Sequence, residues 1–266
     1  MRSTLSKQND RILANTTPAL AFDPALPIEP QKNAAAKAFS DLLRMPEKAT
    51  SPVPIIEYQK DHEIYKEIRF TFESEPGFMV PAHLLLPKNH NGTLPVVICL
   101  QGHSTGMHIS LGRPKFEGDE ETIAGDRDFA LQAVARGYAA VAMEQRGFGE
   151  LKSEITGGCT HPAMQALLLG RTLLGERIFD VSRLIDTLAA FSFLDLDRIG
   201  IMGNSGGGTT SYHAACVEPR IGFVMPSCSF NTYGASIFSI RHCCCNYIPD
   251  ILQIVNSFFI ANSPFV

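Results

Sequence analysis

Ser205 has the surroundings that most clearly predict chemistry in this chain of 266 residues. It is the third residue of GNSGG (203–207), which fits the G-x-S-x-G pattern of a nucleophile elbow. The apolar run before it, 199–202, predicts a buried strand, and residues 209–217 can form a helix after it. A serine on so sharp a turn has strained dihedrals, and neighbouring glycines keep the crossing backbone segments clear of side chains. We therefore predict that Ser205 is a catalytic nucleophile.

The same turn also predicts one half of an oxyanion hole. The backbone N–H of Gly206 would stand at the N-terminus of the helix, where it can donate a hydrogen bond to a developing negative charge. A second donor is expected from the loop QGHSTG (101–106), which follows the nearly unbroken apolar run 94–100. The carboxyl end of such a buried strand is where open α/β sheets bind ligands. We expect the backbone N–H of His103 to be this donor, with Ser104 as the alternative.

The side chain of His103 could in principle act as a general base. We favour a role in which the backbone N–H of His103 is the oxyanion donor and its ring orders the loop.

Two other interpretations concern the glycine-rich turn itself. Gly203, Gly206 and Gly208 could cradle a dinucleotide, but their spacing is G-x-x-G-x-G and they lie late in the chain, unlike the G-x-G-x-x-G fingerprint. The five-residue pattern could also be a structural βα turn with an incidental serine.

No metal ion or cofactor is expected from the sequence. The run Cys243-Cys244-Cys245 after His242 suggests zinc, but three adjacent residues cannot all point at one tetrahedral ion, and C-x-x-C spacing is absent. The acidic residues 118–121 predict a solvated loop, because no histidine or second carboxylate cluster stands at ligand spacing. The seven cysteines, an odd number that lies mostly in apolar segments, predict reduced and buried thiols.

The elements needed to position these residues follow an α/β order. Four prolines predict an arm over residues 1–30, and a helix is expected to begin at Asn33. An antiparallel hairpin follows, and strands then alternate with helices, which predicts a mostly parallel α/β sheet. Arg146, Asp180 and Asp186 are expected to have structural roles. The predicted hairpin strands are 65–74 and 78–87, the later strands 94–100, 138–144, 199–202 and 223–229, and the helical regions 126–136, 161–191 and 209–217.

Length and composition restrict the classes of function. The chain can bury one substantial core, so we divide it into an N-terminal arm and helix, 1–45, and one α/β domain, 46–266. A net charge of −4, from 23 basic and 27 acidic residues, gives no electrostatic argument for nucleic acid or a membrane surface as partner. No apolar run reaches the length of a membrane span, and no leader segment is recognised. We expect a cytoplasmic protein with a small-molecule substrate.

These segments together resemble the α/β-hydrolase fold, and within it the group of acetyl xylan esterases and dienelactone-hydrolase-like esterases. The resemblance rests on the elbow 203–207, the loop LQGHSTG (100–106), the turn EQRGFG (144–149) and the segment RHCCCNYIP (241–249). It implies a serine hydrolase of small carboxylic or acetyl esters, with a triad in the order serine, acid, histidine. A cysteine nucleophile is disfavoured, because serine occupies the elbow.

The sequence departs from that pattern after the strand 223–229. Too few residues follow Ser229 for two further βα units of ~30 residues each, and the strand is followed by Phe230 and Asn231, with no carboxylate. His213 stands about 12 Å along the helix from Ser205, at ~1.5 Å per residue. His242 and Asp250 are the histidine and aspartate left downstream, in reversed order.

A second hypothesis follows from this departure. The chain could be a truncated, catalytically impaired homologue whose fold persists without turnover. The strand 223–229 would then be an exposed sheet edge, covered by the apolar tail 251–266 or by a second copy of the chain.

Overall fold

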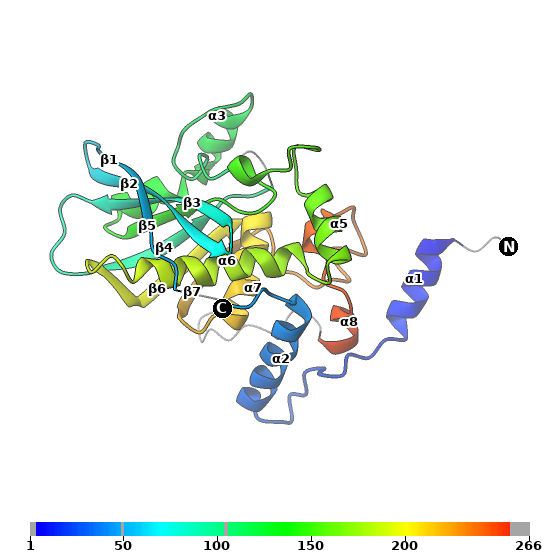
Figure 1. Ribbon diagram of the computed structural model, residues 1–266. Helices are drawn as coiled ribbons and strands as arrows, with labels where there is room; N and C mark the ends of the chain where they lie inside the picture. The colour runs from blue at the N-terminus through cyan, green and yellow to red at the C-terminus, as the bar shows by residue number, and fades with distance from the viewer. Residues whose placement is uncertain (1–3, 49–50, 104–105, 256–266) are drawn as a thin grey trace.

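The computed structural model describes residues 4–48, 51–103 and 106–255. Their centre is a seven-stranded mixed sheet in the order β1-β2-β3-β5-β4-β6-β7 (Figure 1). Neighbouring strands are antiparallel from β1 to β5 and parallel from β5 to β7. The strands are β1 (Ile55–Asp61), β2 (Tyr65–Glu75), β3 (Phe78–Pro87), β4 (Leu94–Leu100), β5 (Ala139–Met143), β6 (Leu194–Asn204) and β7 (Ile221–Ser227).

Helices cover both faces of the parallel part of the sheet. On one face, α2 (Ile28–Leu43), α6 (Leu173–Leu188) and α7 (Gly206–Val217) share one apolar core with the sheet. On the other face, α4 (Phe129–Ala135) packs with side chains of β4 and β5. This two-sided burial explains why β4 and β5 are nearly continuous apolar runs. The remaining helical segments are α1 (Leu5–Ala14), α3 (Asp119–Thr122), η1 (Ile123–Arg127), η2 (Gly149–Leu151), α5 (Thr160–Leu168), η3 (Cys244–Asn246) and α8 (Ile251–Ile254).

The α/β prediction, with its antiparallel hairpin and later parallel strands, is confirmed, and three local features differ from what the sequence led us to expect. Strand β1 was not expected, because all its residues are exposed and carry no buried face that alternation could show. Helix α1 was not expected, and it buries no residue. Helix α2 begins at Ile28, before Asn33, because a proline in the first turn is tolerated where the N–H has no intrahelical partner. The division at residue 45 stays a prediction.

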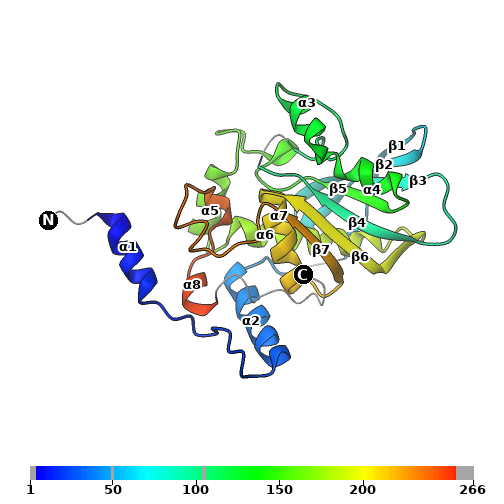
Figure 2. The same cartoon turned by 180° about the vertical axis from the view of Figure 1, so that it is seen from behind.

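The N-terminal arm runs along the molecule and ends in the projecting helix α1 (Figures 1 and 2). The backbone N–H of Ala19 donates to the carbonyl of Gln253 at 2.9 Å, and the N–H of Leu20 donates to Ile254 at 2.8 Å. The arm is therefore fastened to α8. Within the part of the chain that the structure describes, no helix is both long and apolar enough to cross a membrane.

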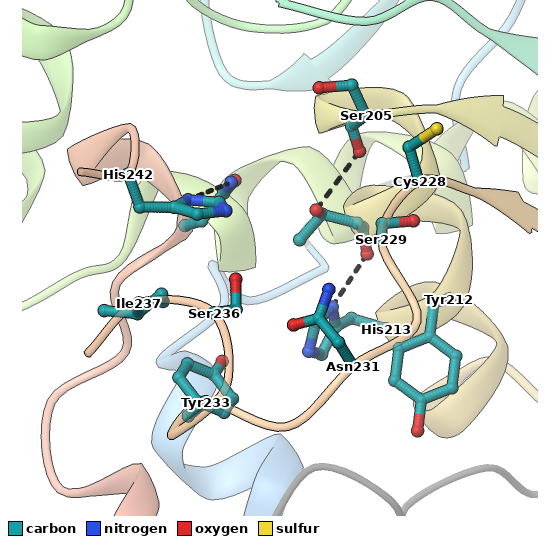
Figure 3. A pocket seen from close by; sticks show the side chains of 12 residues that line it. Ser205, Tyr212, His213, Cys228, Ser229, Asn231, Tyr233, Ser236, Ile237 and His242 are labelled. Atoms are coloured by element: carbon teal, nitrogen blue, oxygen red, sulfur yellow. Dashed lines mark hydrogen bonds between the residues drawn. The ribbon is translucent and has the colours of Figure 1, made fainter. Parts of the chain in front are cut away.

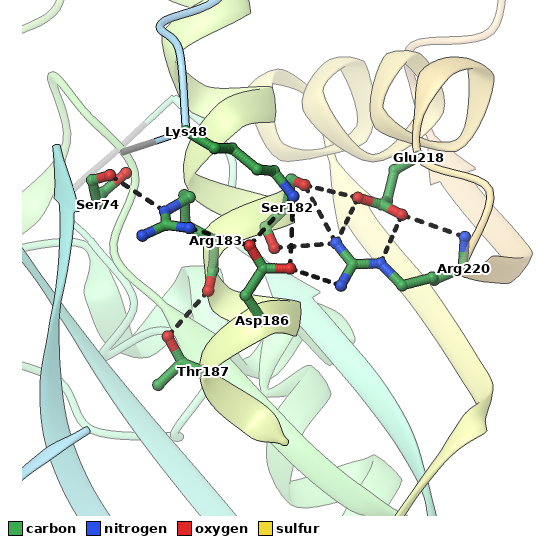
Figure 4. Close-up of polar contacts among 8 residues, drawn as sticks. All are labelled: Lys48, Ser74, Ser182, Arg183, Asp186, Thr187, Glu218 and Arg220. Carbon is green, nitrogen blue, oxygen red and sulfur yellow. Dashed lines mark hydrogen bonds and ion pairs between the residues drawn. The ribbon is translucent and has the colours of Figure 1, made fainter. Parts of the chain in front are cut away.

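Ion pairs fasten α6 to its neighbours (Figure 4). The carboxylate of Asp186 accepts from Arg220 at 2.6 Å and from Lys48 and Arg183, each at 3.1 Å. Arg220 also pairs with Glu218 at 2.7 Å, at the turn between α7 and β7. The predicted structural role of Asp186 agrees with this network.

Arg146 has the structural ion pairs expected of it. Its guanidinium donates two hydrogen bonds to the fully buried Asp180, at 2.7 and 2.8 Å, and pairs with Glu75 at 2.7 Å. The side chain also lies over the ring of Phe78, 4.1 Å from its centroid. Arg146 therefore joins the turn after β5 to α6 and to the β2–β3 hairpin.

Glu144, at the end of β5, braces the loops beside the elbow. Its buried carboxylate accepts from the side-chain amide of Gln101 at 2.6 Å and from the backbone N–H groups of Met107, at 3.2 and 3.3 Å, and Glu150, at 3.1 Å. Burial raises the pKa of Glu144 to about 7, against the lowering effect of these donors. One buried carboxyl group thus joins the loop after β4 to the loop after β5.

Glu144 should give the stability of the protein a distinctive pH dependence. The pKa in the folded protein, about 7, lies above the ordinary value of 4.5. The stabilisation is therefore complete below pH 4.5 and is lost as the pH rises through 7. Relative to Glu144→Gln, the free energy of unfolding of the wild type should fall by roughly 3 kcal/mol over this window, as measured by urea unfolding.

The exposed Glu154→Gln controls for the loss of one carboxyl group. If the wild type instead gained stability relative to Glu144→Gln as the pH rose, the pKa of Glu144 would be lowered in the folded protein. The hydrogen-bond donors would then outweigh burial in setting that pKa.

Candidate active site

The backbone at Ser205 has the strained turn that the sequence predicts. Strand β6 ends at Asn204 and α7 begins at Gly206, so the serine alone makes the turn. Its φ of 52° and ψ of −115° lie outside the regions that side-chain-bearing residues ordinarily occupy, at a cost of about 1–3 kcal/mol. The N–H of Ser205 donates to the carbonyl of Ser227 at 2.8 Å, and its carbonyl accepts from the N–H of Thr209 at 2.8 Å.

Close backbone approaches around the turn require glycine. A methyl group built on Gly203 would collide with the carbonyl group of Gly207. One built on Gly207 would collide with the carbonyl oxygens of Leu100 and Gln101. The close approach at Gly203 brings β6 against α7, and the close approach at Gly207 brings α7 against the end of β4. The glycines therefore let three elements meet at the serine.

The two predicted oxyanion donors lie beside Ser205. Gly206 is the first residue of α7, so its N–H stands at the N-terminus of a twelve-residue helix. The loop after β4 passes close by, because a methyl group on Gly102 would lie 3.4 Å from the Cβ of Ser205. The next residue, His103, faces Gly206, whose added methyl group would lie 2.5 Å from Nδ1. The structure thus brings Ser205, Gly206 and His103 together, whereas Ser104 lies outside the described residues.

The ring of His103 is engaged by other side chains. Its Nε2 lies 3.0 Å from the Sγ of Cys245, and its ring meets that of Phe148 edge-on, with centroids 5.1 Å apart. These contacts agree with the prediction that the ring orders the loop.

Ser205 lines a cavity of about 50 Å³ between α7 and the segment after β7. The volume has space for a few water-sized groups. Its walls are polar, with hydroxyl, amide and imidazole groups from both segments (Figure 3). The lining residues are Ser205, Thr209, Tyr212, His213, Cys228, Ser229, Asn231, Tyr233, Ser236, Ile237, His242 and Asn246.

Two histidines line this cavity, and they differ in their partners. His213, on α7, has Nδ1 2.7 Å from the carbonyl of Thr209 and stacks on Phe39, with ring centroids 5.2 Å apart. Burial lowers its pKa to about 4, so its ring is neutral at pH 7, and among the described residues its Nε2 has no hydrogen-bond partner. Its place in the helix agrees with the argument that it cannot serve the Ser205 hydroxyl.

His242 reaches the cavity from the segment after β7 (Figure 3). Its Nδ1 lies 3.2 Å from the amide nitrogen of Asn246. Asp250, the aspartate considered as its partner, is exposed and occupies the N-cap position of α8, where its side chain makes no capping hydrogen bond. Sequence reasoning missed Asn246, because a single amide four residues after a histidine gives no local signal.

Known proteins resemble this chain in sequence and in fold. The chain is 27% identical, over 149 residues, to the protein named "Putative hydrolase YtaP" of Bacillus subtilis (strain 168). That match covers 56% of this chain and 48% of the relative, so the chain spans about half the length of this curated relative.

Two solved structures share the fold. A "putative acetyl xylan esterase" from Bacteroides fragilis NCTC 9343 superposes with a TM-score of 0.82 at 19% identity, over 100% of this chain and 74% of the other. The acetyl xylan esterase from Paenibacillus sp. R4 gives a TM-score of 0.52 at 19% identity, over 84% and 64% of the two chains. At such identities the likeness concerns the α/β-hydrolase fold.

The sequence also matches a family model over residues 6–232, from α1 to just beyond β7 and through the whole elbow. That range contains most of the chain. The chain therefore belongs to the Abhydrolase family and has the α/β-hydrolase fold.

Proposed function

We propose that this chain hydrolyses small carboxylic esters of the acetyl type and that Ser205 is its nucleophile. The observation that carries the proposal is the strained turn at Ser205 on the wall of a small polar cavity. A serine with a positive φ costs free energy, and a purely structural βα turn could avoid that cost by placing glycine there. The hydrolase and esterase names of the relatives support the same reaction class.

The geometry supports a two-step acyl transfer. The Ser205 Oγ attacks the carbonyl carbon of the ester, and its proton passes to a base. The oxygen of the tetrahedral intermediate then accepts hydrogen bonds from the N–H of Gly206 and from the main chain at His103. Collapse expels the alcohol, which receives the proton, and water then hydrolyses the acyl-enzyme by the same steps. A cavity of about 50 Å³ favours a short acyl group.

Among the described residues, His242 is the best candidate for that base. His242 and His213 both line the cavity with Ser205, but the Nδ1 of His213 contacts a carbonyl of its own helix and burial lowers its pKa to about 4, which makes it a weak base. The Nε2 of His103 faces Cys245. The amide nitrogen of Asn246 lies 3.2 Å from the Nδ1 of His242. With its amide turned over, the oxygen of Asn246 would accept from Nδ1–H and leave Nε2 free to take the proton, which is the role of the asparagine in Cys-His-Asn enzymes.

The nucleophile is tested with a fluorophosphonate probe and p-nitrophenyl acetate. Labelling requires an activated hydroxyl, so the wild type should be labelled once, at Ser205, and should hydrolyse the acetate. Ser205→Ala should lose the label and at least about 1,000-fold in turnover. Ser239→Ala, which removes an exposed hydroxyl, should behave as wild type. An unlabelled but folded wild type would contradict the proposal and favour the non-catalytic homologue.

The base is tested separately. His242→Gln should lower the acetate turnover by at least about 100-fold, because general base catalysis contributes ~10²–10⁴. His90→Gln, on the exposed loop before β4, is the matched control. If His242→Gln kept the wild-type rate while Ser205→Ala lost it, the base would be another group.

We also propose that the chain self-associates through β7, as its exposed edge suggests. In the described sheet β7 is the outermost strand and pairs with β6 alone. Its Phe223 and Met225 are each 44% exposed and border a cavity of about 910 Å³, lined largely by apolar residues of β4, β6 and α4. Of the tail 251–266 that was considered as the alternative cover, residues 251–254 form α8, which lies against α2, and residues 256–266 lie outside the described residues.

Static light scattering at micromolar concentration tests this association. The wild type should scatter as a dimer or larger species, and Met225→Lys should give monomers, because a charge would be buried at the contact. Met79→Lys, in the exposed part of β3, is the control and should leave the mass unchanged. A wild type that is a clean monomer would contradict self-association.

A further inference from the structure

One imidazole and three thiols converge beside the elbow. They belong to His103 after β4, Cys159 at the N-cap of α5, and Cys243 and Cys245 on the segment after β7. Their four potential ligand atoms all lie within 4.8 Å of one another. The Sγ of Cys243 lies 2.9 Å from that of Cys159 and 3.4 Å from that of Cys245, whose Sγ is 3.0 Å from the Nε2 of His103.

These separations suit a small tetrahedral metal ion. Zinc bonds thiolate sulfur at about 2.3 Å and imidazole nitrogen at about 2.0–2.1 Å, which places neighbouring ligand atoms about 3.5–3.8 Å apart. Three of the observed separations, 2.9, 3.0 and 3.4 Å, are shorter than this, and no pair exceeds 4.8 Å, so small side-chain movements would complete the tetrahedron. Cys159 and Cys245 are buried and the other two ligands are half-buried, which shields the site from water. One imidazole with three thiolates is a ligand set of closed, structural zinc sites.

The surroundings supply the charge that such a site needs. A zinc ion with three thiolates and a neutral imidazole carries one net negative charge. Arg177 is fully buried, and its Nη1 lies 3.3 Å from the Sγ of Cys245. Its guanidinium also donates to the carbonyl of Arg146 and lies over the ring of Phe148. Among the described residues its Nη2 has no hydrogen-bond partner. A buried guanidinium without a carboxylate beside it requires a negative neighbour, and the thiolate cluster would provide one.

Simple packing of thiols explains these contacts less well. The Sγ atoms of Cys159 and Cys243, 2.9 Å apart, are closer than two packed thiol groups ordinarily approach. Cys244 separates the two ligands of the run, and its Sγ lies toward the carbonyl of Thr160, 3.9 Å away. Alternate residues of the run thus face the cluster.

We propose that His103, Cys159, Cys243 and Cys245 bind one zinc ion, through Nε2 and three thiolate sulfurs. On binding, the thiol protons pass to solvent and no residue is oxidised or reduced. With four protein ligands the ion has no open position, so it holds segments together instead of activating water. It fixes His103 against Gly206 and holds the residue after His242 beside the elbow. This site does not depend on the chemistry proposed for Ser205.

The test is metal binding by the reduced, metal-free chain, with no ester present. Zinc is titrated against a chromophoric chelator, and cobalt(II) is used as a spectroscopic probe. We expect one ion per chain and a cobalt spectrum with tetrahedral visible bands and thiolate charge-transfer bands. Cys159→Ser, Cys243→Ser and Cys245→Ser should each weaken zinc binding by at least 100-fold. Cys244→Ser, in the same run, should bind as wild type.

Circular dichroism shows which variants fold. If a variant does not fold, the intensity of the charge-transfer bands of cobalt in the wild type still gives the number of thiolate ligands. Absence of zinc binding by the folded wild type would overturn the proposal. Equal weakening by Cys244→Ser would also overturn it. So would a wild type that, by mass spectrometry under non-reducing conditions without added oxidant, already holds a Cys159–Cys243 disulfide and takes up no zinc after reduction.

Discussion

The architecture depends on one constrained reversal of the backbone, at Ser205. There the chain leaves β6 and enters α7 within a single residue, held by the hydrogen bond from its N–H to the carbonyl of Ser227. The reversal is possible only because Gly203 and Gly207 allow backbone atoms to approach at distances that a side chain would forbid. The strain is offset by the buried parallel strands on both sides of β6, and the polar groups around the serine take their positions from it.

The fold was predictable because its main signals are local. The apolar run of β4 reflects burial on both faces, the alternation of Ile68, Phe70 and Phe72 in β2 reflects deeper burial of one face, and the elbow has its own glycine spacing. Strand β1 lacked such a signal, because none of its side chains is buried and its place is set by backbone pairing with β2. Helix α1 contains no fully buried residue, and the prolines that follow it dominated the interpretation of residues 1–30 as an arm.

The site was predictable only where one segment contains it. Ser205 and Gly206 are adjacent, and the loop with His103 follows a strand that is easily recognised. Glu144 is one charged residue at the end of an apolar strand, and its partners come from two other loops. The cysteine run was judged on the spacing of its own residues, which argues against a shared ion. The cluster described here takes alternate residues of that run and adds Cys159 and His103, which only the fold brings near.

The pairing of residues 19–20 with residues 253–254 bears on how the chain is made. On the ribosome, the arm emerges before the strands of the described sheet, and its hydrogen-bonding partners emerge after them. The arm must therefore wait, unpaired, through the synthesis of the core and dock late. Contacts between such distant parts of a sequence carry a large loop-closure entropy and slow folding.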